Sequence, residues 1–216
     1  MAYRRLDIDT SAPESVRGLI KHIEDLSFSD VHSMLRLPIS NYGITAGCNF
    51  AITHVLMSII GGVSTTLYKQ EGKVGTRFKC VLEDYYPWDL EPSGILPKKD
   101  AACAINEVFR NPLTHNLGID VKKKSKGLIV KVKRLKTQSR GGRNRGLTEK
   151  QIENLEVSKT RPNMPATVTK TSQETVLLVE GLYWGIRRMI ERLSADRRRM
   201  FDADAFLSSY GQTGKA

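Results

Sequence analysis

The sequence predicts a mainly helical fold in a single domain over residues 1–216, with a basic β-hairpin and loop inserted at residues 119–146. Two patterns predict the helices. Apolar residues recur every three or four positions, which is the period of a helix with one buried face, and several of these segments open on capping boxes. In the inserted segment apolar and basic residues alternate instead, which is typical of a strand.

The N-terminal part of the chain is expected to form two helices. Residues 11–14 have the pattern of a capping box with a proline in the first turn, and the apolar side of the helix begins at Val16. A second, shorter helix is expected from Ser29 to the residues before Pro38, because a proline disfavours helical geometry in the residue that precedes it.

Residues 41–68 contain no charged side chain, and an apolar stretch of that length could span a bilayer. The polar residues within it and the paired glycines at 61 and 62 argue against a membrane span. The spacing of its apolar residues favours a core helix packed on several sides. We expect His54 in this helix to be a hydrogen-bonded core residue rather than a ligand.

Two further helices are expected before the inserted segment. The first runs from about Thr76 to Pro87, and we assign its aromatic residues to the core, although they could also stack on nucleic-acid bases. The second begins at Pro97 and ends or bends at Asn111, because Pro112 follows. Its buried stripe consists of Ala101, Ile105 and Val108.

The positive charge of the chain is concentrated in one segment. Residues 121–145 hold eleven basic side chains and no acidic one, whereas the other 23 Lys and Arg residues balance the 23 acidic residues, so the net charge of +11 resides here. Residues 121–125 and 126–136 are expected to form the two strands of the hairpin. Lysines can protect an exposed strand edge against aggregation, and an acidic protein could also bind this segment. Binding to the phosphate backbone of a nucleic acid explains its unopposed positive charge better. The residues expected to bind phosphates are Lys122, Lys123, Lys124, Lys126, Lys131, Lys133, Arg134, Arg140, Arg143 and Arg145.

The C-terminal third is predicted to be helical again. A capping box at residues 148–151 opens a short helix, and a second one at residues 171–174 is expected to open the last long helix. The apolar stripe of that helix consists of Val179, Leu182, Ile186, Met189 and Leu193. Its other side is expected to be a basic surface formed by Arg187, Arg188, Arg192 and residues 197–199. A final short helix is expected at residues 202–210.

The candidate functional residues lie at the end of the helix at residues 97–111, where Arg110 is followed five positions later by His115. A guanidinium offers forked donors to phosphate oxygens, and an imidazole that titrates near neutrality can transfer a proton. Together these groups suit phosphodiester transfer. The spacing alone is weak evidence, because Arg17 and His22 share it, and Glu107 with Arg110 could be an ordinary ion pair within the helix.

The stretch Arg110-Asn111-Pro112-Leu113-Thr114-His115 resembles the HEPN superfamily, whose motif is Arg, four to six residues and His, with a polar residue directly after the Arg. The resemblance covers about a dozen residues and their helical context. It implies a HEPN-like helical bundle that forms a homodimer or a higher even oligomer. It also implies a metal-independent endoribonuclease that needs no cofactor.

The resemblance further implies roles for individual residues. Arg110 would clamp the scissile phosphate, His115 would act as general base or acid, Asn111 would orient the phosphate or the histidine, and Glu107 would hold Arg110. The basic segment would gather RNA. Such families often act as toxins or in phage defence, so a neutralising antitoxin or another partner protein is a further expectation.

The alternative function is a non-catalytic helical module that binds nucleic acid or an acidic partner through its basic segment. The sequence has no phosphate-binding glycine loop followed by Lys and Ser or Thr, no Gly-x-Ser-x-Gly motif and no metal-ligand spacing. Its cysteines, Cys48, Cys80 and Cys103, are odd in number and far apart. This favours free buried thiols in a reducing cytoplasm. Separately, no membrane association is expected.

Overall fold

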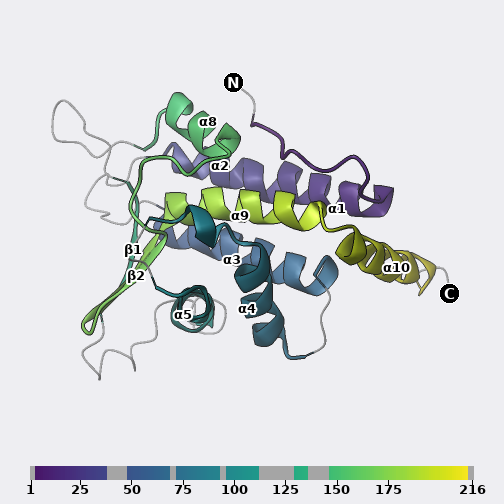
Figure 1. Ribbon diagram of the computed structural model, residues 1–216. Helices are drawn as coiled ribbons and strands as arrows, with labels where there is room; N and C mark the ends of the chain where they lie inside the picture. The colour runs from purple at the N-terminus through teal and green to yellow at the C-terminus, as the bar shows by residue number, and fades with distance from the viewer. Residues whose placement is uncertain are drawn as a thin grey trace.

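A computed structural model describes residues 3–37, 48–68, 72–92, 96–111, 129–135 and 146–213. The chain is mainly helical, with a small three-stranded sheet at one end (Figure 1). This confirms the predicted fold class at the level of a mainly helical protein. Among the described residues, no helix combines the length and the apolar composition needed to cross a bilayer.

The elements are as follows. The α-helices are α1 (Glu14–Ile23), α2 (Ser29–Leu35), α3 (Asn49–Thr66), α4 (Val74–Tyr85), α5 (Lys98–Ala104), α8 (Glu149–Val157), α9 (Val179–Ser194) and α10 (Arg197–Thr213). The π-helical turns are η1 (Glu24–Phe28) and η3 (Ile105–Arg110), and a 3-10 turn is η2 (Trp88–Leu90). The strands are β1 (Ile129–Lys133), β2 (Val168–Lys170) and β3 (Glu174–Leu178). Helices α1 and α2 are continuous through η1, so the two predicted N-terminal helices form one rod.

Helix α9 is the centre of the core. It lies between α1 and α2 on one side and α3 on the other (Figure 1), and it also packs against α4, α8 and α10. Every residue of its predicted apolar stripe is buried, which confirms that part of the prediction. Burying one such aliphatic side chain stabilises a fold by roughly 1.5–3 kcal/mol, so the five residues of the stripe together make a large contribution to the core.

The predicted basic surface is wrong for Arg187 and Arg188, which are buried. Arg192 on α9 and Arg197 and Arg198 on α10 are exposed, as predicted. Arg187 donates to the backbone carbonyl of Arg4 at 2.7 Å, and Arg188 donates to that of Glu156 at 2.8 Å. The guanidinium of Arg187 also lies within 6 Å of the ring centroids of Tyr3, Phe28 and Tyr183. Tyr183 lies four residues before Arg187 on the same helix, but the other partners come from segments far away in the sequence. Helical periodicity could not reveal those distant partners.

The sheet differs from the predicted hairpin. A strand was predicted at residues 126–136, and residues 129–133 of it form β1. Its partner among the described residues is β3, in parallel, with β2 antiparallel on the far side of β3. The predicted partner strand, residues 121–125, lies outside the described residues. Residues 171–174, predicted to cap a helix, form the turn between β2 and β3 instead. The Thr171 hydroxyl accepts from the backbone N–H of Glu174 at 3.0 Å, a hydrogen bond that hairpin turns and helix caps share.

Of the two other predicted capping boxes, one is confirmed and one is wrong, and the predicted burial of His54 is also wrong. The capping box at residues 148–151 is confirmed, with reciprocal hydrogen bonds between Thr148 and Gln151. The one at residues 11–14 is wrong, because Pro13 is the N-cap of α1 and makes no side-chain cap. His54 is exposed on α3 rather than part of the core.

Asp196 joins α9 to α10 and provides a testable cap. Its carboxylate accepts from the backbone N–H of Arg199 at 3.1 Å and from the hydroxyl of Tyr85 at 2.5 Å. The Tyr85 hydrogen bond lowers the pKa of Asp196. A carboxyl group whose pKa is lower in the folded state stabilises the fold above its unfolded pKa, and this contribution is lost as the pH falls through the folded pKa.

We expect Asp196→Ala to lower the free energy of unfolding by about 1 kcal/mol at neutral pH, the usual cost of losing an N-cap. The difference from the wild type should shrink in acid, when the wild-type carboxylate becomes protonated. Urea unfolding at pH 7 and at pH 3 measures both effects. Asp196→Asn, which keeps a capping oxygen, is the control; a loss that is the same at both pH values would contradict the assignment.

Candidate functional site

The candidate site is the C-terminal end of the continuous helix formed by α5 and η3. Ala101, Ile105 and Val108 are buried as predicted, and α5 and η3 pack against α4. Helical geometry continues to Asn111, the last residue that the structure describes before residue 129. The π-helical turn has i to i+5 hydrogen bonding, which widens the turn and brings residues four and five positions apart toward the same side.

Arg110 is held by two neutral amides and one ring. Its Nη1 donates to Oδ1 of Asn111 at 3.1 Å and makes a longer contact of 3.4 Å with Oδ1 of Asn106. The guanidinium carbon lies 5.0 Å from the centroid of the Phe78 ring on α4. Arg110 is half-buried, and this burial lowers the pKa of its guanidinium.

The arrangement leaves one edge of the guanidinium available within the part of the chain that the structure describes. Both amides contact Nη1, and neither Nε nor Nη2 of Arg110 has a hydrogen bond to a described residue. Nε and Nη2 form the edge that can donate two parallel hydrogen bonds to the oxygens of one phosphate or carboxylate. A partly desolvated cation with neutral partners attracts an anion, because the anion offsets the cost of desolvation.

The other predicted site residues have different positions. His115 lies outside the described residues. Glu107 is exposed, and its carboxylate is 3.9 Å from Nζ of Lys79 on α4. The sequence predicted that Glu107 would hold Arg110. In this structure Asn106 and Asn111 hold Arg110 instead. Asn106 was missed, although its position four residues before Arg110 on one helix was a usable signal.

Only part of the predicted phosphate-binding surface lies in the described segments. Lys131 and Lys133 are exposed on β1 and both approach the carboxylate of Glu174. Arg134 is buried, and its Nε donates to Oε1 of Glu180 at 3.0 Å, so this guanidinium belongs to the core rather than to the surface. The structure does not describe Lys122, Lys123, Lys124, Lys126, Arg140, Arg143 and Arg145.

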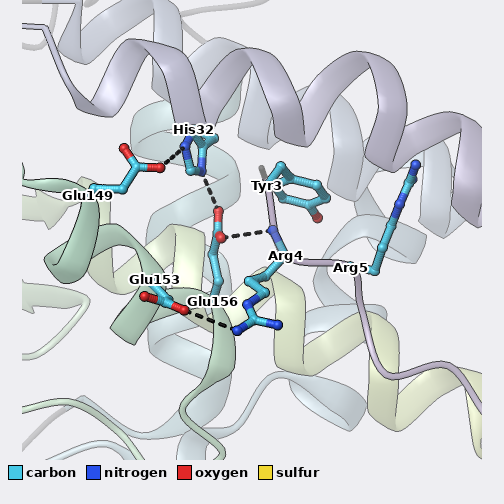
Figure 2. Close-up of a pocket in the computed structure, with 7 residues that line it drawn as sticks. All are labelled: Tyr3, Arg4, Arg5, His32, Glu149, Glu153 and Glu156. Carbon is cyan, nitrogen blue, oxygen red and sulfur yellow. Dashed lines mark hydrogen bonds and ion pairs between the residues drawn. The ribbon is translucent and has the colours of Figure 1, made fainter. Parts of the chain in front are cut away.

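A separate cavity of about 600 Å³ lies between α2, α8 and the N-terminal segment (Figure 2). His32 donates from Nδ1 to Oε1 of buried Glu156 at 2.8 Å, and the same oxygen accepts from the hydroxyl of Tyr183 at 2.7 Å. Glu156 also accepts from the backbone N–H of Arg4 at 3.1 Å, and the Arg4 side chain pairs with Glu153 at 3.1 Å. These groups bind one another, so their role is to fasten the N-terminal segment to α2 and α8.

The described segments contain no group of three or more His, Cys, Asp or Glu residues that could hold a metal ion. The three cysteines form no disulfide. Cys48 is exposed and Cys80 and Cys103 are partly buried, so the predicted full burial of the thiols is wrong. Comparison of the chain with protein-family models, with curated proteins and with solved structures finds no match.

Proposed function

We propose that this chain is a metal-independent endoribonuclease of the HEPN type, in which Arg110 binds the scissile phosphate and His115 transfers protons. The observation that supports this proposal is the arrangement around Arg110. Its half-buried guanidinium contacts two neutral amides and an aromatic ring among the described residues, and the Nε–Nη2 edge is left for an anion.

The proposed reaction needs two protein functions. A general base removes the proton from the ribose 2′-hydroxyl, whose oxygen attacks the phosphorus, while a general acid protonates the 5′-oxygen as its bond to phosphorus breaks. The products are a 2′,3′-cyclic phosphate and a 5′-hydroxyl. His115 serves one of these steps, and His115 of a second copy would serve the other in the dimer that the resemblance implies. Arg110 stabilises the negative charge on the non-bridging oxygens in the transition state.

The proposed RNA path includes the exposed lysines of β1. Lys131 and Lys133 present their side chains at the surface, and each ammonium group that neutralises a phosphate makes binding more sensitive to salt. Arg134 is left out of this surface, because its guanidinium is buried against Glu180.

Single substitutions at the two proposed catalytic positions test the function. Arg110→Ala and His115→Ala are each expected to lower the rate of RNA cleavage by about a hundredfold or more. Cleavage by the wild type should be unchanged by EDTA and should leave cyclic phosphate ends. Gel analysis of a mixed RNA with end-group analysis of the products measures both.

Arg17→Ala and His22→Ala are matched controls, because these residues have the same spacing and are both exposed on α1. They should leave the rate unchanged. Cleavage that survives in His115→Ala, or that requires a divalent metal, would refute the proposed mechanism. Salt-sensitive RNA binding without any product would favour the non-catalytic module instead.

A further inference from the structure

We propose that Asn106 is a positioning residue, which holds Nη1 of Arg110 and thereby turns the Nε–Nη2 edge of the guanidinium toward a tetrahedral oxyanion. This inference rests on the proposed function for the identity of the anion, a phosphodiester. It differs from the sequence-based expectation, in which Glu107 holds Arg110.

The position of Asn106 is itself fixed by packing. Its side chain is buried, with 4% of the residue exposed. Gly75 on α4 lies beside this amide, and a Cβ at that position would be in ordinary van der Waals contact with Nδ2 of Asn106, at 3.5 Å. Phe78, one helical turn further along α4, is fully buried and lies against the Arg110 guanidinium. The amide and the ring are therefore both buried, and they form a packed support against which the half-buried Arg110 side chain lies.

The π-helical turn explains why two amides reach the same nitrogen. Asn106 and Asn111 are five positions apart, which in an α-helix would place them on different sides. Within η3 and the residue that follows it, both amide oxygens lie within 3.4 Å of Nη1 of Arg110. One nitrogen thus contacts both acceptors, whereas Nε and Nη2 have no acceptor within the described part of the chain and form a pair of parallel donors.

The absence of charge on the Asn106 amide matters for anion binding as much as its position does. A carboxylate in place of the Asn106 amide would form an ion pair with Arg110 in a partly desolvated site, and it would compete with a phosphate for the same cation. An amide oxygen accepts a hydrogen bond but leaves the positive charge of the guanidinium for the ligand. The site therefore restrains the cation without neutralising it.

The test introduces that competing charge with almost no change in shape. We expect Asn106→Asp to weaken binding of a 2′-deoxy oligonucleotide, which cannot be cleaved, by about tenfold or more at pH 8. The loss should diminish as the pH is lowered and the new carboxylate becomes protonated. Fluorescence anisotropy over a pH series measures both affinities. The recovery is judged from the ratio of the dissociation constants of the variant and the wild type at each pH, because protonation of histidines strengthens the binding of both proteins alike.

A double-mutant cycle shows whether the effect passes through Arg110. In an Arg110→Ala background Asn106→Asp should have little further effect on binding. An equal loss in both backgrounds, or a loss that does not change with pH, would overturn the inference. If Asn106→Asp does not fold, Asn111→Asp places a carboxylate at the half-buried second partner of Nη1, with the same expected recovery and the same refuting outcomes.

The two proposals fail in different ways. Wild-type protein that binds the deoxy oligonucleotide through Arg110 but cleaves no RNA would refute the proposed function and leave the positioning role of Asn106 in place. Wild-type protein that cleaves RNA, with both activity and binding unchanged in Asn106→Asp, would refute the positioning role alone.

Discussion

Glu180→Ala is expected to lower the free energy of unfolding by about 3–5 kcal/mol, because it leaves the buried guanidinium of Arg134 without its counter-charge. Both side chains are fully buried, and Nε of Arg134 donates to Oε1 of Glu180 at 3.0 Å. The second carboxylate oxygen accepts from the backbone N–H of Leu135 at 3.1 Å, and Arg134 also donates to the carbonyl of Leu35. This pair thus connects the end of β1 to the start of α9 and the end of α2.

The comparison with an exposed ion pair makes the test specific. Glu174 pairs with Lys131 at the surface of the sheet, so Glu174→Ala should cost less than about 1 kcal/mol. The double substitution Arg134→Met with Glu180→Leu should recover most of the loss, since neither charge remains buried. Urea unfolding of the three variants measures the differences. A Glu180→Ala protein as stable as Glu174→Ala would show that Arg134 reaches solvent.

Gly185→Ala is expected to lower the free energy of unfolding by about 3 kcal/mol, near the upper end of the usual range for overpacking a core. A Cβ on Gly185 of α9 would lie 2.1–2.2 Å from the ring and hydroxyl atoms of Tyr86. That ring has little room to move, because it is buried and its hydroxyl bonds with Thr167 at 2.7 Å and donates to the carbonyl of Gly181 at 3.1 Å.

A second glycine provides the matched control for this prediction. Gly62 lies exposed on α3, and a Cβ there would meet no atom within 4 Å. Gly62→Ala should therefore stabilise the protein by about 0.5–1 kcal/mol, the usual gain of alanine over glycine inside a helix. Thermal and urea unfolding measure both variants. Similar behaviour of the two would mean that α9 and Tyr86 are not in close contact.

Local sequence patterns predicted the parts of the fold that depend on local physics. The spacing of apolar residues identified α3, α4 and α9, since each buries one face or more, and the alternation in β1 identified a strand. The partners of buried polar residues could not be identified this way. Three arginines look like surface residues in the sequence but are buried, namely Arg134, Arg187 and Arg188. Each donates hydrogen bonds to a carboxylate or a backbone carbonyl from a distant segment.

In the candidate site too, features that depend on local sequence could be predicted, whereas contacts between distant segments could not. The position of Arg110 next to Asn111 at the end of a helix follows from Pro112, and Asn106 could have been found from its spacing on that helix. Phe78 could not, because it comes from α4 and contacts Arg110 only through the packing of two helices. The role of His115 stays a prediction, since that residue lies outside the described part of the chain.

The central place of α9 has a consequence for how the protein is made. This helix follows α3 and α4 in the chain, and both of them pack against it. A nascent chain that has exposed α3 and α4 but not yet α9 therefore lacks the partner that covers part of their apolar surface. Such long-range dependence slows folding and leaves intermediates open to aggregation until α9 has emerged from the ribosome.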